Sequence, residues 1–157
     1  MGKRDNKNLH SAKKAKNDEF YTQYKDIENE CKHYIQHFKD QWIYMPCDSE
    51  RSNFWRYFID HFEEYNIRRL TATHINFDGS SYRLDYEGKD VVKTPLIGNG
   101  DFRSEECTKI KDESDMVITN PPFSLFREFM YWLQGGTFHK NEYGEYERDY
   151  EKMSDIG

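Results

Sequence analysis

The chain has 157 residues and a net charge of -6, a length that suits one domain, and 17% of its residues are aromatic, which excludes a disordered chain. No run approaches the roughly 20 apolar positions of a membrane span, and no apolar run follows the first basic residues, so we expect neither a membrane partner nor a secretory signal. The three cysteines are too few and too scattered for a disulfide framework or a metal knuckle, so we expect a reduced intracellular protein without a metal site.

A basic arm precedes the first predicted element. Residues 1–16 hold six Lys and Arg against one acid, Asp5, and we expect them to be disordered. Such an arm either contacts phosphates through counterion release or is a solvated tail, and charge alone leaves both open. From Tyr24 to Phe38, apolar residues recur every three or four positions, which predicts an amphipathic helix.

The next segments alternate between strand and helix. Trp42–Met45 is a continuous apolar run ended by Pro46, which suits a buried strand. Ser52 is a suitable N-cap for a helix whose aromatic face runs to Tyr65. A β-type segment follows over 70–75. Strand, helix and strand in this order predict the start of a βαβ unit and therefore a parallel sheet.

The middle of the chain departs from this alternation. Turn signals at Asp78-Gly79 and Glu87-Gly88 flank alternating aromatic and aliphatic residues, which predicts a β-hairpin within 76–94. This hairpin stands where a crossover helix would otherwise be expected. A weak helix is predicted over 104–113, and 115–119 is predicted to be another buried strand.

A last helix is predicted after residue 123. Ser124 is a suitable N-cap, and Gly135-Gly136 ends the helix. Residues 137–157 are polar, acidic and tyrosine-rich without clear periodicity, so we expect a tail there. The expected inward face of the helix consists of Leu125, Phe126, Phe129, Met130 and Leu133.

The sequence Asn120-Pro121-Pro122-Phe123 directly follows the strand predicted over 115–119. Ligands of open α/β sheets bind beyond the carboxyl ends of the strands, and an asparagine before proline is held extended. The side-chain oxygen of Asn120 and the carbonyl of Pro121 can both accept from an exocyclic amine, while Phe123 can stack on its ring. A strand-ending turn is the plain alternative, but the flanking strand and helix favour a binding site.

Four blocks stand in order along the chain: NDEFYTQY at 17–24, PCDSERSNFWRYF at 46–58, GNGDFRS at 98–104 and NPPF at 120–123. The last resembles the (D/N/S)PP(Y/F/W) motif of amino-methyltransferases. Together the four blocks resemble the adenine-specific DNA methyltransferases of the EcoRI modification type, over about residues 16–130. This resemblance implies an α/β, Rossmann-like fold that depends on S-adenosylmethionine, with a mostly parallel sheet and the inserted hairpin. It also implies direct methyl transfer to the N6 amine of an adenine flipped out of DNA.

The resemblance implies roles for single residues. Asp48 takes the amino-acid end of the cofactor, and Asp101 accepts from its adenine amine. The acid that usually binds the ribose is missing after the second strand; its substitute stays open, although Asp78 is near. The implied catalytic residues are Asn120, Pro121, Pro122 and Phe123, and the implied cofactor contacts are Phe20, Tyr21, Thr22, Asp48, Ser52, Asn53, Asp101 and Phe102.

Beyond Met130 the sequence departs from the family pattern, because the further strands of a complete domain are not predicted. We therefore expect the N-terminal portion of a methyltransferase domain over 17–136 and a polar acidic tail over 137–157, in the cytoplasm of a bacterial or phage-infected cell. The chain is either an active DNA methyltransferase, completed by a second chain that supplies the missing strands and target recognition, or a truncated, non-catalytic remnant that binds cofactor or a partner. A third interpretation is methyl transfer to RNA or to a protein glutamine, since NPP(Y/F) motifs serve those acceptors too.

Overall fold

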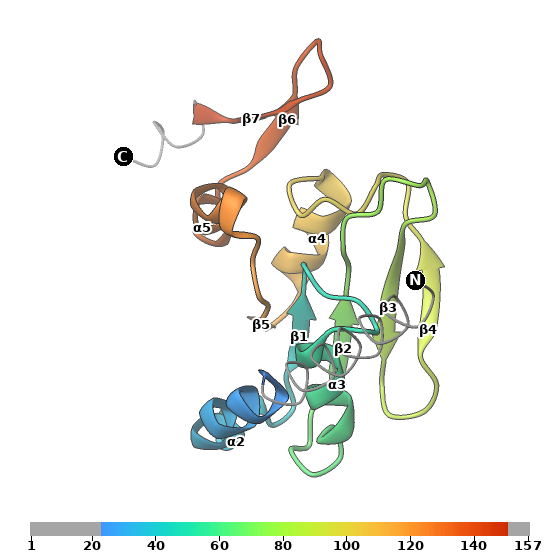
Figure 1. Cartoon of the computed structure of the whole chain (residues 1–157), viewed down its shortest axis with the longest axis vertical. Coiled ribbons are helices and arrows are strands. Elements are labelled where there is room, and N and C mark those ends of the chain that lie inside the picture. Colours follow the sequence, from blue (N-terminus) through green and yellow to red (C-terminus); the bar gives the residue numbers. More distant parts are fainter. Residues whose placement is uncertain (1–22, 151–157) are drawn as a thin grey trace, which may run out of the picture.

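The computed structural model describes residues 23–150, which form a five-stranded mixed sheet with helices packed on it and a separate two-stranded hairpin (Figure 1). The arm predicted over 1–16 and the block at 17–22 lie outside the described residues. The strand order is β4-β3-β2-β1-β5. The strands of this sheet are β1 (Trp42–Met45), β2 (Arg69–Ala72), β3 (Tyr82–Tyr86), β4 (Val92–Pro95) and β5 (Met116–Val117).

The sheet is parallel around β1 and antiparallel toward β4. β1 pairs in parallel with β2 on one side and with β5 on the other, as the alternation of strand and helix predicts. β3 and β4 form an antiparallel hairpin that continues the sheet from β2, which confirms the predicted insertion. A further crossover connection would place a parallel strand beside β2. In this structure β3 of the inserted hairpin lies there instead.

The first predicted helix is broken. Tyr34, predicted on its apolar face, is exposed, so that part of the prediction is wrong. The break turns the chain so that Phe38 reaches the core, where its ring centroid lies 5.3 Å from that of Phe58. In place of one helix the structure has helical residues 23–31, a 3-10 turn η1 (Lys32–Tyr34) and a short helix α2 (Ile35–Phe38).

Helix α3 (Asn53–Asp60) covers the same face of the sheet as α2 and confirms that a helix follows Ser52. Its predicted extent to Tyr65 is wrong, because residues 61–66 form turns. Trp55 and Phe58 of α3 are buried in a cluster that also holds Ile43 of β1. Ser52 stands at the N-cap position, but its hydroxyl donates to the carbonyl of Ser49 at 2.9 Å and makes no capping bond.

Two helices cover the other face of β1. Helix α4 (Glu105–Glu113) begins as predicted, because the Ser104 hydroxyl accepts from the backbone N–H of Cys107 at 3.2 Å. Helix α5 (Phe126–Leu133) follows a 3-10 turn η2 (Phe123–Leu125). Their apolar side chains bury a second cluster against β1, made of Trp42, Tyr44, Phe102, Ile110, Phe129 and Trp132.

Helix α5 is rotated from the predicted orientation. Ser124 lies inside the 3-10 turn rather than at the N-cap, and Phe126, Met130 and Leu133 of the predicted inward face are 51%, 39% and 38% exposed. The reason is Trp132, which is fully buried and whose indole N–H donates to the Thr108 hydroxyl at 3.0 Å. Burying the largest side chain with its polar atom satisfied turns the smaller side chains outward.

Strand β5 is shorter and less buried than predicted. A buried strand is expected over 115–119, but only Met116 and Val117 form the ladder, and both are half-buried. Within residues 23–150, β5 pairs with β1 alone, so its other edge is open. Asp115 precedes β5 and also bonds to β1: its backbone N–H donates to the Trp42 carbonyl at 2.9 Å, and its carboxylate accepts from the Trp42 backbone N–H and from Arg68, each at 2.8 Å.

The segment after α5 holds a hairpin that the sequence does not predict. Strands β6 (Phe138–Lys140) and β7 (Tyr146–Arg148) pair antiparallel beyond α5 (Figure 1). Gly144, at φ +77, lies in the turn between them, where a glycine adopts the left-handed conformation without strain. Phe138 packs against the second cluster, so this part of the expected tail contacts the core.

A polar network crosses the strands on the face of β2 that carries Thr71. The Trp42 indole N–H donates to the Thr71 hydroxyl at 2.8 Å, and that hydroxyl donates to Asp85 at 2.6 Å. Arg69 and Arg83 each donate to the same carboxylate, with shortest distances of 2.8 Å. The network joins β1, β2 and β3 and thereby ties the inserted hairpin to the parallel strands.

Replacing this carboxylate tests the network. Burial raises the pKa of Asp85, but hydrogen bonds from Arg83 and Thr71 outweigh it, so the pKa lies below its ordinary value. The stabilisation is therefore present above the unfolded pKa of about 4 and is lost as pH falls through the lower folded pKa. We expect Asp85→Asn to lower the free energy of unfolding by about 1–3 kcal/mol at pH 7 and by less below about pH 4. Urea unfolding measures this, with exposed Asp90→Asn as the control; a difference independent of pH contradicts it.

Candidate active site

Two adjoining cavities open at the carboxyl ends of β1, β2 and β5. The smaller one encloses about 210 Å³ and the larger about 530 Å³. Cys47 and Asn120 line both cavities, so the two adjoin at these residues, and together they are called the cleft below. The cleft thus lies where ligands bind in open α/β sheets.

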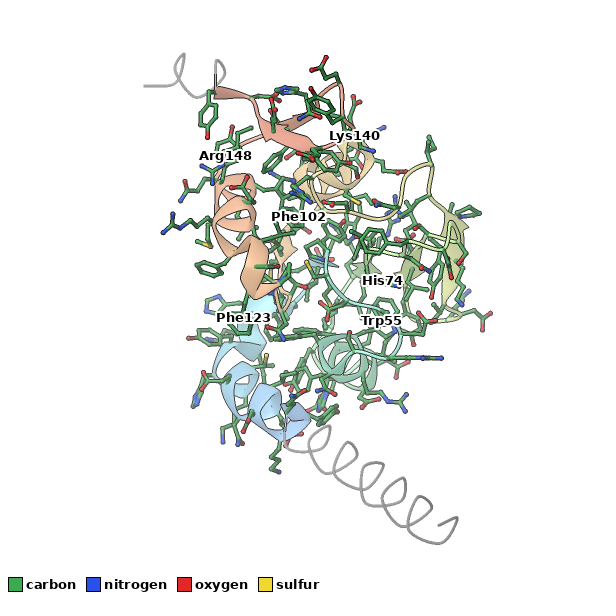
Figure 2. All side chains as sticks on the ribbon, turned by 45° about the horizontal axis from the view of Figure 1, so that its top comes forward. Trp55, His74, Phe102, Phe123, Lys140 and Arg148 are labelled. Carbon is green, nitrogen blue, oxygen red and sulfur yellow. The ribbon has the colours of Figure 1, made fainter. Side chains whose placement is uncertain are left out.

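The asparagine-proline block lies at the junction of the two cavities. Asn120 lines both of them and Pro122 lines the smaller. Phe123 is 93% exposed and presents its ring to solvent at the start of η2 (Figure 2). The structure therefore brings Asn120 and Pro122 into the cleft and leaves Phe123 outside its lining.

The larger cavity gathers the residues after β1 and at the start of α3. Asp48, Ser52 and Asn53 line it, as does Asp26 from the N-terminal helical segment. The Asn53 side-chain N–H donates to Gln23 at 2.8 Å, but its carbonyl oxygen is buried without a partner among the described residues. Such an acceptor suits a ligand N–H. Phe20, Tyr21 and Thr22 fall outside the described residues.

The loops after β1 and β5 are tied together by Thr119. Its hydroxyl donates to the buried carboxyl of Asp48 and accepts from the backbone N–H of Cys47 at 3.1 Å. The backbone N–H of Asp48 donates in turn to the carbonyl of Thr73 after β2, at 3.0 Å. Burial raises the pKa of Asp48. Three strand ends are therefore held in one fixed arrangement directly beside Asn120.

Asp101 is buried in the wall of the smaller cavity. It is 4% exposed and accepts from Arg103 three times, from the backbone N–H at 2.9 Å and from the guanidinium at 3.0 and 2.8 Å. A carboxylate has about four acceptor positions, so one remains for a donor in the cavity. Phe102 lines the same cavity.

The loop that carries Asp101 approaches the end of β2 very closely. Gly100 has φ +86, and a Cβ there would lie 2.0 Å from the carbonyl oxygen of His74. His74 and Ile75 line the smaller cavity (Figure 2 labels His74), and sequence reasoning missed both. One indication of them is present in the sequence: the acid that usually binds the ribose is missing after β2, where His74 and Ile75 stand. Asp78, the residue then suspected, accepts from Ser80 and does not line either cavity.

The walls of the smaller cavity are largely apolar. Pro46 after β1 and Leu125 at the end of η2 line it together with Ile75. None of these three residues was singled out from the sequence as a contact. Apolar residues around a single carboxylate suit a flat ring that carries one polar group.

The fold and the cleft define an α/β protein with a cavity at the carboxyl edge of its parallel strands. The family described as adenine-specific methyltransferase EcoRI matches residues 8–140, and the chain belongs to this family, which confirms the resemblance.

The curated relatives are longer than this chain. It is 44% identical over 144 residues to the type II methyltransferase M.EcoRI of Escherichia coli, covering 80% of this chain and 44% of that protein. It is 44% identical over 120 residues to the type II methyltransferase M.MpnI of Mycoplasma pneumoniae, covering 76% of this chain and 38% of that protein. The chain spans less than half the length of these relatives. No solved structure matches it. Across residues 23–150, no helix has the length and apolar character to cross a membrane.

The close approach at Gly100 can be tested against a matched glycine. Gly79 has the same φ of +86, but a Cβ added there would meet no other atom within 4 Å. Gly79→Ala should cost about 1–2 kcal/mol of unfolding free energy through backbone strain alone. Gly100→Ala should cost about 1–3 kcal/mol more, because the new methyl displaces His74. Denaturant unfolding of both variants measures the difference, and equal losses would contradict the contact.

The hydroxyl of Thr119 can be tested with two near-isosteric variants. Thr119→Val leaves the Asp48 carboxyl and the Cys47 N–H without this partner, so we expect a loss of about 1–3 kcal/mol in unfolding free energy. Thr119→Ser keeps the hydroxyl and should retain most of the stability. Chemical unfolding of the two variants is the measurement; a serine variant as unstable as the valine variant would show that the methyl group matters instead.

Proposed function

We propose that this chain carries the cofactor and catalytic part of a Rossmann-like DNA methyltransferase, which transfers a methyl group from S-adenosylmethionine to the N6 amine of adenine. The observation that carries this proposal is the position of Asn120. This side chain lines both cavities, so it lies between the two ends of the space proposed for the methyl donor, where an acceptor amine would have to approach. Membership of the family supports the same reaction.

The smaller cavity fits the adenine of the cofactor. Its walls include Pro46, Ile75 and Leu125, which are apolar and suit the faces of a flat ring. Asp101 supplies one buried carboxylate acceptor for the exocyclic amine of that ring. His74 lies in the same wall and offers a ring nitrogen for the ribose hydroxyls that an acid usually binds.

The larger cavity fits the amino-acid end of the cofactor. Asp48 and the unpartnered carbonyl oxygen of Asn53 are acceptors for its ammonium group. Ser52 adds a hydroxyl at the start of α3. Phe20, Tyr21 and Thr22 remain proposed contacts from the resemblance alone.

The residues of the chain act mainly by positioning the acceptor. When bound, the cofactor supplies an electrophilic methyl group on its sulfonium. The side-chain oxygen of Asn120 and the carbonyl of Pro121 accept from the target amine and aim its lone pair at that methyl. Transfer would give the methylated amine and the thioether form of the cofactor, and the amine would release one proton to solvent. The exposed ring of Phe123 is available to stack on the flipped base.

DNA is the proposed partner, with a second polypeptide segment that supplies target recognition. A non-catalytic cofactor-binding chain is the alternative, and the share of the relatives that this chain covers, 44% and 38%, keeps it open. Calorimetric titration with S-adenosylhomocysteine and transfer of tritiated methyl groups to adenine-containing DNA separate the two. Binding with no transfer supports the alternative, and label in RNA or protein redirects the acceptor.

Asn120→Ala tests the central assignment. Because the amide acts on the acceptor amine, we expect methyl transfer to fall by about 100-fold or more while cofactor affinity changes little. The assay is incorporation of tritiated methyl into DNA, alongside calorimetry with S-adenosylhomocysteine. Gln134→Ala, an exposed amide after α5, is the matched control and should leave both unchanged. Transfer by Asn120→Ala at the rate of the unchanged chain would overturn the assignment.

A further inference from the structure

The β6–β7 hairpin packs on the back of the smaller cavity, although most of it lies beyond the family match. That match ends at residue 140, whereas β7 spans Tyr146–Arg148. Phe138 of β6 packs in the second cluster with Phe102, which lines the cavity; their ring centroids lie 6.5 Å apart. Figure 2 shows Lys140 and Arg148 on this hairpin, above Phe102 in that view.

A chain of contacts runs from the hairpin to the cavity. The Arg103 guanidinium carbon lies 4.9 Å from the ring centroid of Tyr146. The same guanidinium donates to both carboxylate oxygens of Asp101, at 3.0 and 2.8 Å. Tyr146 therefore contacts one side of Arg103 while Asp101 holds its donors, and Asp101 in turn faces the cavity.

The hairpin is itself fixed to α5, so Tyr146 is not a loosely placed ring. Arg148 donates to both oxygens of Glu128, with a shortest distance of 2.7 Å, and its guanidinium lies 4.6 Å from the ring centroid of Tyr131. The ring of Tyr131 also packs edge-on against Phe138 at 5.3 Å. These contacts place β7 at a defined distance from the cavity wall.

The direction of the Asp101 carboxylate depends on Arg103. Three of its acceptor positions are taken by this one residue, so a shift of the guanidinium turns the remaining acceptor away from the cavity. A cation over an aromatic face is held by about 0.5–2 kcal/mol, the more so when it is partly desolvated. Arg103 is 18% exposed and satisfies that condition.

We propose that Tyr146 is a positioning residue for recognition of the cofactor adenine: it holds Arg103, which orients the Asp101 carboxylate toward the 6-amino group. This inference rests on the proposed function. It assigns to the β6–β7 hairpin, which the sequence presents as a polar tail, a part in the ligand site. Tyr146 acts through Arg103 and does not itself line the smaller cavity.

Calorimetry on the full chain tests the proposal with two ligands. S-adenosylhomocysteine carries the 6-amino group, and S-inosylhomocysteine lacks it. Tyr146→Ala should weaken binding of the first about 3- to 30-fold and leave binding of the second unchanged. Tyr146→Phe keeps the ring and should bind both as the unchanged chain does. Tyr143→Ala, at a tyrosine 79% exposed in the same hairpin, is the control. Equal weakening for both ligands, or none, overturns the proposal.

A second readout separates failure of this inference from failure of the proposed function. The Arg103 side-chain Nε–H should give a sharp, slowly exchanging NMR signal in the unchanged chain and in Tyr146→Phe, and should lose it in Tyr146→Ala. If the unchanged chain binds neither ligand, the proposed function fails while this signal still reports whether Tyr146 holds Arg103. A signal equally protected in Tyr146→Ala overturns the positioning role.

Discussion

Strand β1 is buried on both faces, and the position of every functional side chain follows from that burial. Ile43 and Met45 face one aromatic cluster, while Trp42 and Tyr44 face the other. A strand whose side chains are buried on both faces cannot slip by one residue without exchanging the two clusters, so its register with β2 and β5 is set. The carboxyl end of β1 is thereby fixed, and with it the loop that carries Asp48.

Threonine hydroxyl groups at the strand ends hold the loop after β1, which forms part of the cleft wall. Thr73 and Thr119 follow β2 and β5. The Thr73 hydroxyl donates to the Pro46 carbonyl at 3.4 Å, and the Thr119 hydroxyl bonds to Cys47 and Asp48, so both hold the loop after β1. Among the described residues, the carbonyl oxygen of Asn53 is the buried side-chain atom that lacks a hydrogen-bond partner, and Asn53 lines the cleft. A buried acceptor without a partner is expected at a binding site, because a bound ligand can donate a hydrogen bond to it.

Local patterns carried the prediction of the sheet, while long-range packing limited it. The apolar run at β1 and the helix predicted over 104–113 depend on residues close in sequence and are confirmed. The orientation of α5 depends on the hydrogen bond from Trp132 to Thr108 of α4. These two residues are far apart in sequence, so no local pattern predicts their contact. The family blocks led to Asp101, which lines the smaller cavity, but they do not indicate the contact between Arg103 and Tyr146.

The short polar strands of β6 and β7 escaped prediction for a different reason. Each has three residues, and none of these is fully buried, so the alternation of polar and apolar residues that marks a half-buried strand is too brief to detect. Their stability comes from ion pairs and ring contacts with α5, such as that between Arg148 and Glu128.

The two edge strands of the sheet, β4 and β5, differ in whether a further strand can pair with them. β4 is exposed throughout and carries Lys93 and Pro95, a charge and a residue without an N–H, which discourage pairing at that border. The two residues of β5 include neither a charged residue nor a proline. The exposed apolar side chains of α5 follow β5 closely in sequence. A parallel strand added at β5 would bring its own carboxyl end beside Asn120. The edge at β5 is therefore also the side from which the residues of an added strand can line the cleft.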